Sequence, residues 1–144
     1  MQSSNMKKIA FSVAVILLTT ISYSQDSQLE YSNKIKNADS LIKLKDYKGA
    51  AREYSKAFEA MAWKGKLLDR YNAACCWALA GVSDSAFFQL YKMATFENMP
   101  YKNYDHITTD SDLLSLHNDK RWQPLLEMIR KNKEKAEASG GTTQ

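Results

Sequence analysis

Two adjacent cysteines, Cys75 and Cys76, lie in the stretch RYNAACCWALAG (70–81), whose apolar spacing predicts a helix. Cysteine thiolates act as redox groups and metal ligands, so this pair is a candidate for chemistry. Redox motifs of the thioredoxin type place two residues between the cysteines and use a helix N-terminus to lower the thiol pKa, whereas these cysteines are consecutive and lie in mid-helix. A disulfide between them would distort the helical backbone. We expect two small buried apolar side chains, with a redox or metal role as the alternative.

The two histidines, His106 and His117, are eleven residues apart, with several aspartates around them. A metal site would need ligands three or four residues apart on one helix, or a tight loop rich in carboxylates. The stretch DHITTDSD (105–112) lacks the glycine and the distal glutamate of a calcium loop. The aspartates are better explained as helix caps and turn residues. Signatures of GxSxG hydrolases, phosphate-binding loops and paired catalytic carboxylates are absent, so the sequence predicts neither an enzyme nor a cofactor.

Residues 1–24 have the features of an export signal. Lys7 and Lys8 precede a charge-free apolar run over residues 9–21, and Ser22 and Ser24 place small residues where a signal peptidase reads. The run is too short to cross a bilayer, which needs about 20 residues. We expect cleavage after Ser24 and a periplasmic or secreted mature chain, with an uncleaved membrane anchor as the alternative.

The mature chain would be mildly basic. Loss of Lys7 and Lys8 from 20 basic residues leaves 18 against 16 acidic residues, a net charge of about +2. The basic residues are scattered among acids, and the densest patch, RKNKEKAEASGG (130–141), alternates in sign. Nucleic-acid binding would need a clustered basic footprint, so no nucleic-acid partner is expected.

From Leu29 onward the sequence is typical of helices. Apolar residues recur at three- and four-residue spacing in four stretches, and strand-like alternation is nearly absent. These stretches begin at Tyr31, Tyr47, Leu67 and Ala86, and the third ends at Gly81, where we expect a left-handed cap. The pattern predicts an all-α domain over residues 25–138 and a disordered tail over residues 139–144.

The helical stretches also repeat with an offset of 36 residues. Residues 37–58 laid over residues 73–94 pair Ala38 with Ala74, Leu41 with Trp77, Ala50 with Ala86, and Tyr54 with Leu90. Two alanines twelve residues apart, one in each helix of a pair, let the backbones approach closely, and the bulky residue that follows fills the remaining space.

These residues resemble the tetratricopeptide repeat (TPR), a helix hairpin of about 34 residues. The turn KDYKGA (45–50) is similar to the family's Gly-Asp-Tyr turn, and YNAACCWALAG (71–81) to its first-helix string. The resemblance implies two hairpins stacked as a short solenoid and closed by a C-terminal capping helix. It places Cys76 at a tightly packed position and Cys75 on the groove side. The side chains that it implies for packing between helices are Ala38, Leu41, Ala50, Tyr54, Ala57, Ala74, Trp77, Ala86 and Leu90.

Residues 101–137 are similar to a closing segment that follows such repeats in bacterial proteins. Thr109 and Asp112 have the spacing of a capping box for a short helix through Leu116. Asn118 or Asp119 can cap the last helix. That helix carries one apolar seam, formed by Trp122, Leu125, Leu126 and Ile129. Two repeats are fewer than the three that a solenoid usually needs, so either this cap supplies a third layer or the protein associates with itself.

In stacked hairpins the first helices line a concave groove, whose side chains are free to meet a ligand. By register these are Ile35, Lys36, Asp39, Ile42, Lys43, Leu68, Tyr71, Asn72 and Cys75. Asn72 stands where some TPR proteins use an asparagine to bind a peptide, but Ile35 and Asp39 do not match the rest of that carboxylate clamp. The alternative for Tyr71 and Leu68 is packing beneath the final helix, which could also cover the groove.

The resulting hypothesis is a non-enzymatic protein–protein interaction module of the cell envelope or exterior, which binds a peptide or partner helix in the groove. No small-molecule substrate is expected. Two alternatives stay open: a small thiol redox or metal-binding protein that uses Cys75 and Cys76, and a structural subunit of an envelope complex.

Overall fold

The computed structural model describes residues 25–97 and 99–140, and within these ranges the chain is all-helical, as predicted. The first helix covers residues 25–43 and is called the N-terminal helix below. The segments that follow are α2 (Tyr47–Ala60), α3 (Leu67–Leu79), α4 (Ser83–Ala94), α5 (Tyr104–Thr109), the 3₁₀ helix η1 (Ser111–Leu116) and α6 (Trp122–Gly140).

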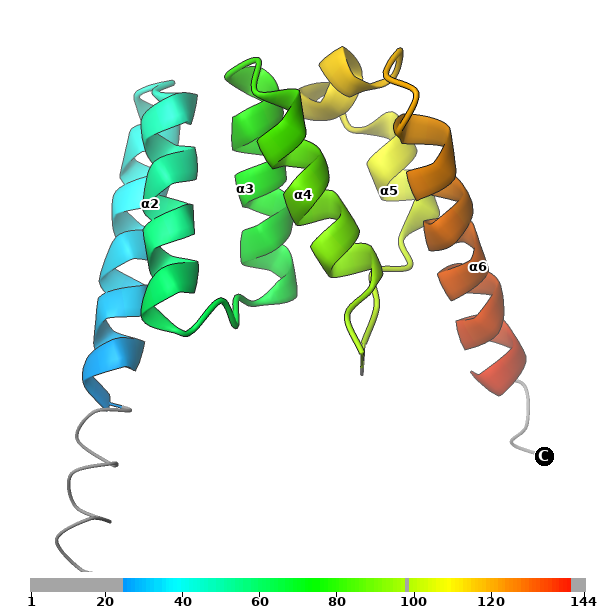
Figure 1. Ribbon diagram of the computed structural model, residues 1–144, viewed down its shortest axis with the longest axis horizontal. Coiled ribbons are helices and arrows are strands. Elements are labelled where there is room, and N and C mark those ends of the chain that lie inside the picture. The colour runs from blue at the N-terminus through cyan, green and yellow to red at the C-terminus, as the bar shows by residue number, and fades with distance from the viewer. Residues whose placement is uncertain (1–24, 98, 141–144) are drawn as a thin grey trace, which may run out of the picture.

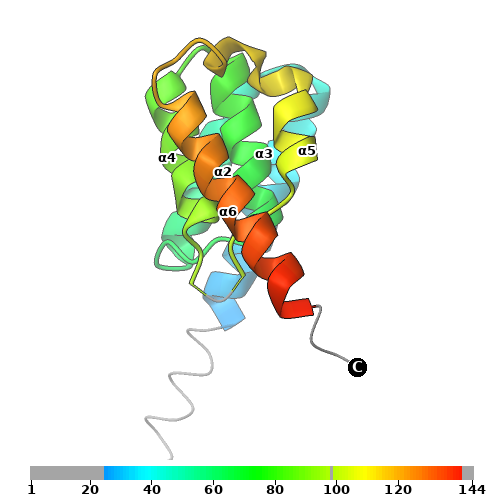
Figure 2. The ribbon, with the colours of Figure 1, turned by 90° about the vertical axis from the view of Figure 1, so that its right-hand side faces the viewer.

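The helices form two layers (Figure 1). The N-terminal helix, α3 and α5 lie behind, and α2, α4 and α6 lie in front. Figure 2, turned by 90°, shows α4 on one side of α6 and α5 with α3 on the other. The short connections leave successive helices antiparallel and side by side, so the chain alternates between the layers from one helix to the next.

Local signals in the sequence account for the helix ends. The Asp46 side chain accepts a 2.9 Å hydrogen bond from the backbone N–H of Gly49, which caps the start of α2. After α3, Gly81 adopts φ 73°, so the predicted left-handed cap is confirmed. The N–H of Gly81 donates to Ala78 O, which satisfies one of the last carbonyls of α3.

The N-terminal helix, α2 and one face of α3 enclose a first hydrophobic core, called the N-terminal core. Ala38, Ala50 and Ala57 are fully buried there, and their small side chains let the helices approach closely around the rings of Tyr54 and Phe58. Leu41 is half-buried against the same core. Cys76 reaches it from α3.

A second cluster, called the C-terminal core, lies between α3, α4, α5, η1 and α6. Ala74 and Cys75 enter it from α3, Ala86 and Leu90 enter it from α4, and Trp77 is half-buried against both cores. The predicted seam of α6 is buried in this core and consists of Trp122, Leu125, Leu126 and Ile129. The central helix α3 therefore contributes to both cores.

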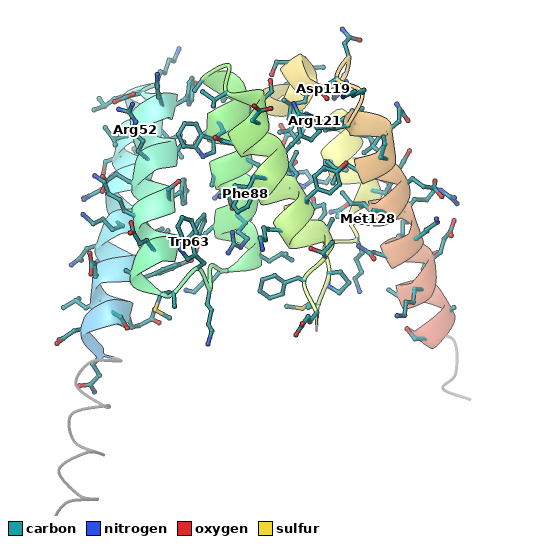
Figure 3. The ribbon with its side chains drawn as sticks, in the orientation of Figure 1. Arg52, Trp63, Phe88, Asp119, Arg121 and Met128 are labelled. Atoms are coloured by element: carbon teal, nitrogen blue, oxygen red, sulfur yellow. The ribbon has the colours of Figure 1, made fainter. Side chains whose placement is uncertain are left out.

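The segment before α6 differs from the prediction. Thr109 does not open a capping box, because it is the last residue of α5 and its hydroxyl donates to the carbonyl of Asp105. Asp110 caps η1 instead, accepting a hydrogen bond from the N–H of Asp112. Before α6, Asp119 accepts from the N–H and guanidinium of Arg121 (Figure 3).

Three predictions concern the ends of the chain. The export signal over residues 1–24, with its cleavage point, lies outside the described residues, as do residues 141–144. Helix α6 continues to Gly140, two residues beyond the expected domain end at residue 138. Across residues 25–97 and 99–140, no helix combines the length and the apolarity needed to span a membrane.

Candidate functional site

A groove with a volume of about 450 Å³ lies over α3 on the side of the N-terminal helix and α5. One stripe of α3 at three- and four-residue spacing supplies its floor, because such residues share a helix face. Ile42 and Tyr47 stand on one side of the floor, and His106, Asp110 and Asp112 stand on the other. The floor residues are Leu68, Tyr71, Asn72, Cys75, Cys76 and Leu79. The described residues of α6 are absent from this lining, so α6 does not cover this α3 groove.

The α3 groove presents two exposed apolar side chains. Leu68 is 66% exposed and Leu79 is 41% exposed, although both are large aliphatic residues. They are eleven positions apart on one helix, which is about 16 Å at 1.5 Å per residue. That length matches about five residues of extended peptide or three turns of helix.

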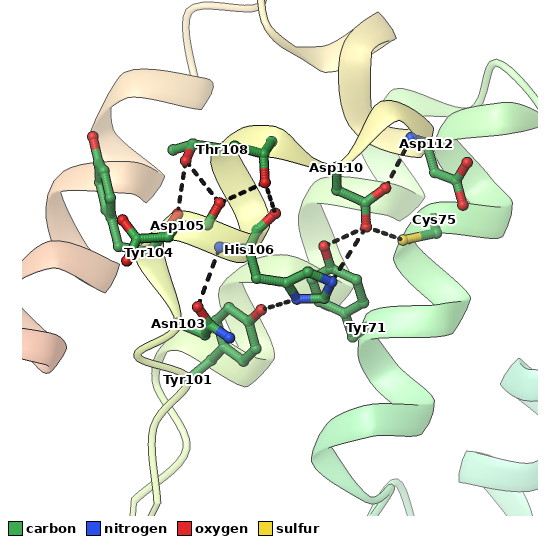
Figure 4. Close-up of polar contacts among 11 residues, drawn as sticks. Tyr71, Cys75, Tyr101, Asn103, Tyr104, Asp105, His106, Thr108, Asp110 and Asp112 are labelled. Atoms are coloured by element: carbon green, nitrogen blue, oxygen red, sulfur yellow. Dashed lines mark hydrogen bonds and ion pairs between the residues drawn. The ribbon is translucent and has the colours of Figure 1, made fainter.

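Asp110 forms the polar side of the groove (Figure 4). Its Oδ2 accepts a 2.6 Å hydrogen bond from the hydroxyl of Tyr71. The same oxygen lies 3.8 Å from Cys75 Sγ and 3.8 Å from His106 Nε2. Its Oδ1 accepts from the N–H of Asp112 at 2.9 Å. Both carboxylate oxygens are therefore engaged by the protein itself.

Tyr71 is held between two other rings and is only 4% exposed. Its ring stacks on His106 with a centroid distance of 4.7 Å and on Tyr101 at 5.5 Å. The Tyr101 hydroxyl and His106 Nδ1 are 2.7 Å apart, which fixes the imidazole in the stack. Burial, followed by the hydrogen bond to Asp110, raises the pKa of Tyr71 far above its ordinary value. This phenol is therefore protonated at neutral pH and serves as a donor.

The two cysteines are free and buried, as the sequence predicted for packing residues. Burial is the main cause that raises the pKa of both thiols, to about 12 for Cys76 and higher for Cys75, where Asp110 adds to the effect. Only thiolates attack electrophiles or ligate metals readily. Neither thiol is activated in this arrangement.

Among the described residues, one group has the composition of a metal site: Cys75, Asp110 and Asp112, whose ligand atoms lie within 4.8 Å of one another. A divalent cation there would have to displace the hydrogen bonds that Asp110 accepts and a proton from Cys75. Helix capping and the bond from Tyr71 already account for the position of Asp110. His117 lies away from this group and stacks on Trp122 at 4.5 Å.

The structure brings together part of the predicted groove. Leu68, Tyr71 and Asn72 line it, together with Ile42 and Cys75. Ile35 packs against the N-terminal core instead. The exposed residues Lys36, Asp39 and Lys43 do not line the groove. Leu68 does not pack beneath the final helix, and Tyr71 is covered by Tyr101 and His106.

Asp39 contacts Tyr54 instead of the groove. The Tyr54 hydroxyl donates to Asp39 Oδ1 at 3.2 Å, which links the N-terminal helix to α2.

Sequence reasoning missed Tyr47 and Leu79 on α2 and α3 and the three residues contributed by the segment 101–116. Leu79 could have been found, because it continues the spacing of Leu68, Asn72 and Cys75. His106 could not have been assigned to the groove from the sequence. It lies in α5, which has six residues of which only Ile107 is buried, so the sequence of this helix has no apolar period.

Comparison with protein-family models, with curated proteins and with solved structures found no match for this chain.

Proposed function

We propose that the chain is a non-enzymatic protein–protein interaction module built from TPR-like hairpins, and that it binds a peptide or partner helix in the α3 groove. The observation that carries the proposal is the groove itself: exposed Leu68 and Leu79 beside a fixed polar side at Asp110. Apolar anchors next to a few oriented polar groups are typical of peptide-binding surfaces.

The packing supports a repeat of three hairpins instead of two hairpins and a cap. The 36-residue offset that pairs Ala86 with Ala50 leads on to Trp122, and all three are buried. Two further sets of residues are related by the same 36-residue offset, and all their members are buried: Tyr54, Leu90 and Leu126, and Ala57, Met93 and Ile129. In this proposal α5 and η1 together take the place of the third first helix, which satisfies the usual minimum of three repeats.

The chemistry of the groove also supports a binding role. The Tyr71 phenol and the Cys75 thiol are buried with raised pKa values, and Asp110 is engaged on both oxygens. These groups are oriented as fixed donors and acceptors. A preformed surface of this kind loses little entropy when an extended ligand binds.

The proposed location follows from residues 1–24. Their basic start, apolar run and small residues at 22 and 24 support export to the periplasm or the exterior. Sequencing the N-terminus of the protein from envelope or culture fractions tests this point, with Gln25 as the expected first residue.

Selection of peptides tests the binding proposal. Random twelve-residue peptides displayed on phage are selected against the purified protein, and their affinities are measured by fluorescence anisotropy. Leu68→Glu and Leu79→Glu should each weaken binding at least about tenfold, because they place a charge on the apolar anchors. The matched control is Leu114→Glu, because Leu114 is 60% exposed and lies outside the groove lining. Equal losses for Leu68→Glu and Leu114→Glu would contradict the proposal.

A structural subunit would behave differently in the same preparation. Self-association through the groove predicts that the sedimentation coefficient rises with protein concentration and that Leu68→Glu abolishes the rise. A peptide receptor should sediment as one species at about 10 and 200 μM, a range that includes the dissociation constants of weak dimers.

A further inference from the structure

A second cluster of side chains lies on the opposite layer, between the loop after α2 and the outer face of α4. Figure 3 shows Trp63 beside the lower part of α2 and Phe88 on α4, both on the face turned toward the viewer. Trp63 is 53% exposed and Phe88 is 48% exposed. Together with Arg70 and Lys92 they line a cavity of about 310 Å³, called the Trp63 cavity below. An adjoining cavity shares Trp63, Arg70 and Lys92 and extends to Phe96 and Glu97.

Arg70 is a buried cation without an acidic partner. Its side chain is 3% exposed, and its two terminal nitrogens donate to neutral oxygens, Gln89 Oε1 at 2.7 Å and the carbonyl of Trp63. Its Nε is buried and has no hydrogen-bond partner in the described chain. The guanidinium carbon lies 4.6 Å from the centroid of Phe58. Burial of a guanidinium is costly unless an anion compensates it, so this arrangement leaves a positive charge available to a ligand.

Two of the other three arginines pair with carboxylates, whereas the exposed Arg52 forms no ion pair among the described residues. Arg121 contacts Asp84 and Asp119, both at 2.7 Å. Arg130 contacts Glu127 and Glu134. Both arginines are more exposed than Arg70, yet each has two carboxylate partners. Arg70 is therefore more buried than Arg121 and Arg130, yet it contacts no carboxylate in the described residues.

Lys92 adds a second positive charge at the mouth of the Trp63 cavity. Its Nζ lies 5.7 Å from the centroid of Phe88, and it forms no ion pair among the described residues. Glu97 is exposed and borders the adjoining cavity, but it is not part of the lining of the Trp63 cavity. The Trp63 cavity thus has two cations and two aromatic walls, and its described lining contains no acid.

The loop that carries Trp63 has an unusual backbone. Ala62 and Trp63 both adopt the left-handed region, with φ 48° and 63°. Residues other than glycine rarely occupy this region, and two in succession are unfavourable. The conformation aims the Trp63 carbonyl at Arg70 while its ring stays exposed.

From these observations we infer a second binding site, in which an acidic side chain of a partner protein enters between Trp63 and Phe88 and places its carboxylate against Lys92 and Arg70. A carboxylate matches the planar donor array of a guanidinium, and apolar residues next to it in the partner would pack on the two exposed rings. The site lies on the layer opposite the α3 groove, so it does not depend on the function proposed above.

Two peptides test the inference against the full-length protein. The acidic probe is the capped hexapeptide Gly-Leu-Asp-Glu-Leu-Gly, and its neutral counterpart carries Asn and Gln in place of Asp and Glu. Binding is followed by the NMR signal of the Arg70 Nε–H group. We expect the acidic peptide to bind at least about fivefold more tightly and to shift the Arg70 signal, with weaker binding at high salt. Equal affinities, or no shift of the Arg70 signal, would overturn the inference.

Variants at the surface keep the test independent of folding. Lys92→Glu should weaken binding of the acidic peptide about tenfold. Phe88→Ala should weaken binding of both peptides, because it removes an aromatic wall of the cavity. The matched control, Lys43→Glu on the other layer, should leave the affinity unchanged. If Lys43→Glu weakens binding of the acidic peptide as much as Lys92→Glu does, the peptide is bound by general electrostatic attraction and the proposed site is rejected. Binding to phosphatidylglycerol vesicles without binding to the peptide would likewise reject a protein partner in favour of a membrane surface.

Discussion

The hydroxyl of Tyr71 donates a 2.6 Å hydrogen bond to Asp110 Oδ2, joining the middle of α3 to the junction of α5 and η1 across 39 positions of the chain. The same carboxylate caps η1 through the N–H of Asp112. This contact therefore connects the floor of the α3 groove to the element that forms its polar side.

Tyr71→Phe should lower the free energy of unfolding by about 1.5–3 kcal/mol, the range for a hydrogen bond to a charged group. The ring stack with Tyr101 and His106 would remain, so the change isolates the hydroxyl. Urea unfolding followed by circular dichroism provides the measurement. Tyr104→Phe is the control, because the Tyr104 hydroxyl makes no hydrogen bond among the described residues. Losses of equal size in the two variants would contradict the assigned role of the Tyr71 hydroxyl.

Gly65→Ala should destabilise the protein by about 1–3 kcal/mol, the usual cost of overpacking a core. A Cβ at this position would lie 2.5 Å from Cε1 of Phe58, a fully buried ring. The ring cannot move freely, because the guanidinium of Arg70 lies against it. Thermal unfolding measures the change. Gly140→Ala serves as the matched control, because no atom lies near its added Cβ and its effect should be close to zero. A stable Gly65→Ala variant would show that Phe58 has room to shift.

Stability at acid pH should depend on Asp119. The hydrogen bonds from Arg121 lower the pKa of this carboxyl from 3.8 to about 2. A carboxyl whose pKa is lowered by folding stabilises the protein fully above its unfolded pKa and loses that contribution as the pH falls through the folded value. The loss is expected between about pH 4 and pH 2. Asp119→Asn should flatten the pH profile of the melting temperature in this window.

A substitution of Arg121 tests whether this residue causes the low pKa of Asp119. Arg121→Gln should flatten the same part of the profile, since it takes away the groups that lower the Asp119 pKa. A profile for either variant that follows the wild type down to pH 2 would count against the interaction.

The two thiols should react slowly in the folded protein. Burial raises the pKa of Cys76 to about 12 and that of Cys75 further, so the thiolate is scarce at pH 8. With a disulfide reagent such as dithionitrobenzoate, the native rate should be at least about 100-fold below that of free cysteine. In guanidinium chloride both thiols should react fully. Rapid modification of one thiol in the native protein would instead favour a redox role.

The helices that the sequence predicted best are those with a long apolar period. The stripe through Tyr47, Tyr54 and Phe58 identified α2, because each of its turns buries an apolar residue. Gly81 marked the end of α3 correctly for a local reason, its positive φ. Segment α5 escaped prediction because six residues with one buried side chain have no measurable period.

Arg70 illustrates a different limit. A cation in a helix is expected to face solvent, because its burial is costly. Here the Phe58 ring, Gln89 and the Trp63 carbonyl enclose it, and these groups come from three separate segments. Only the tertiary structure brings them together, so no local pattern around Arg70 could have indicated its burial. The same reason explains why Asp110 and His106 were not assigned to the groove.

The consecutive cysteines of α3 point into different cores, Cys75 into the C-terminal core and Cys76 into the N-terminal core. Neighbouring positions on a helix are about 100° apart, so any rotation of α3 about its axis would unpack one side while crowding the other. Packing contacts with both cores thus fix the orientation of α3 about its own axis. Its remaining face, with Leu68, Asn72 and Leu79, is consequently held at one constant angle to the rest of the protein.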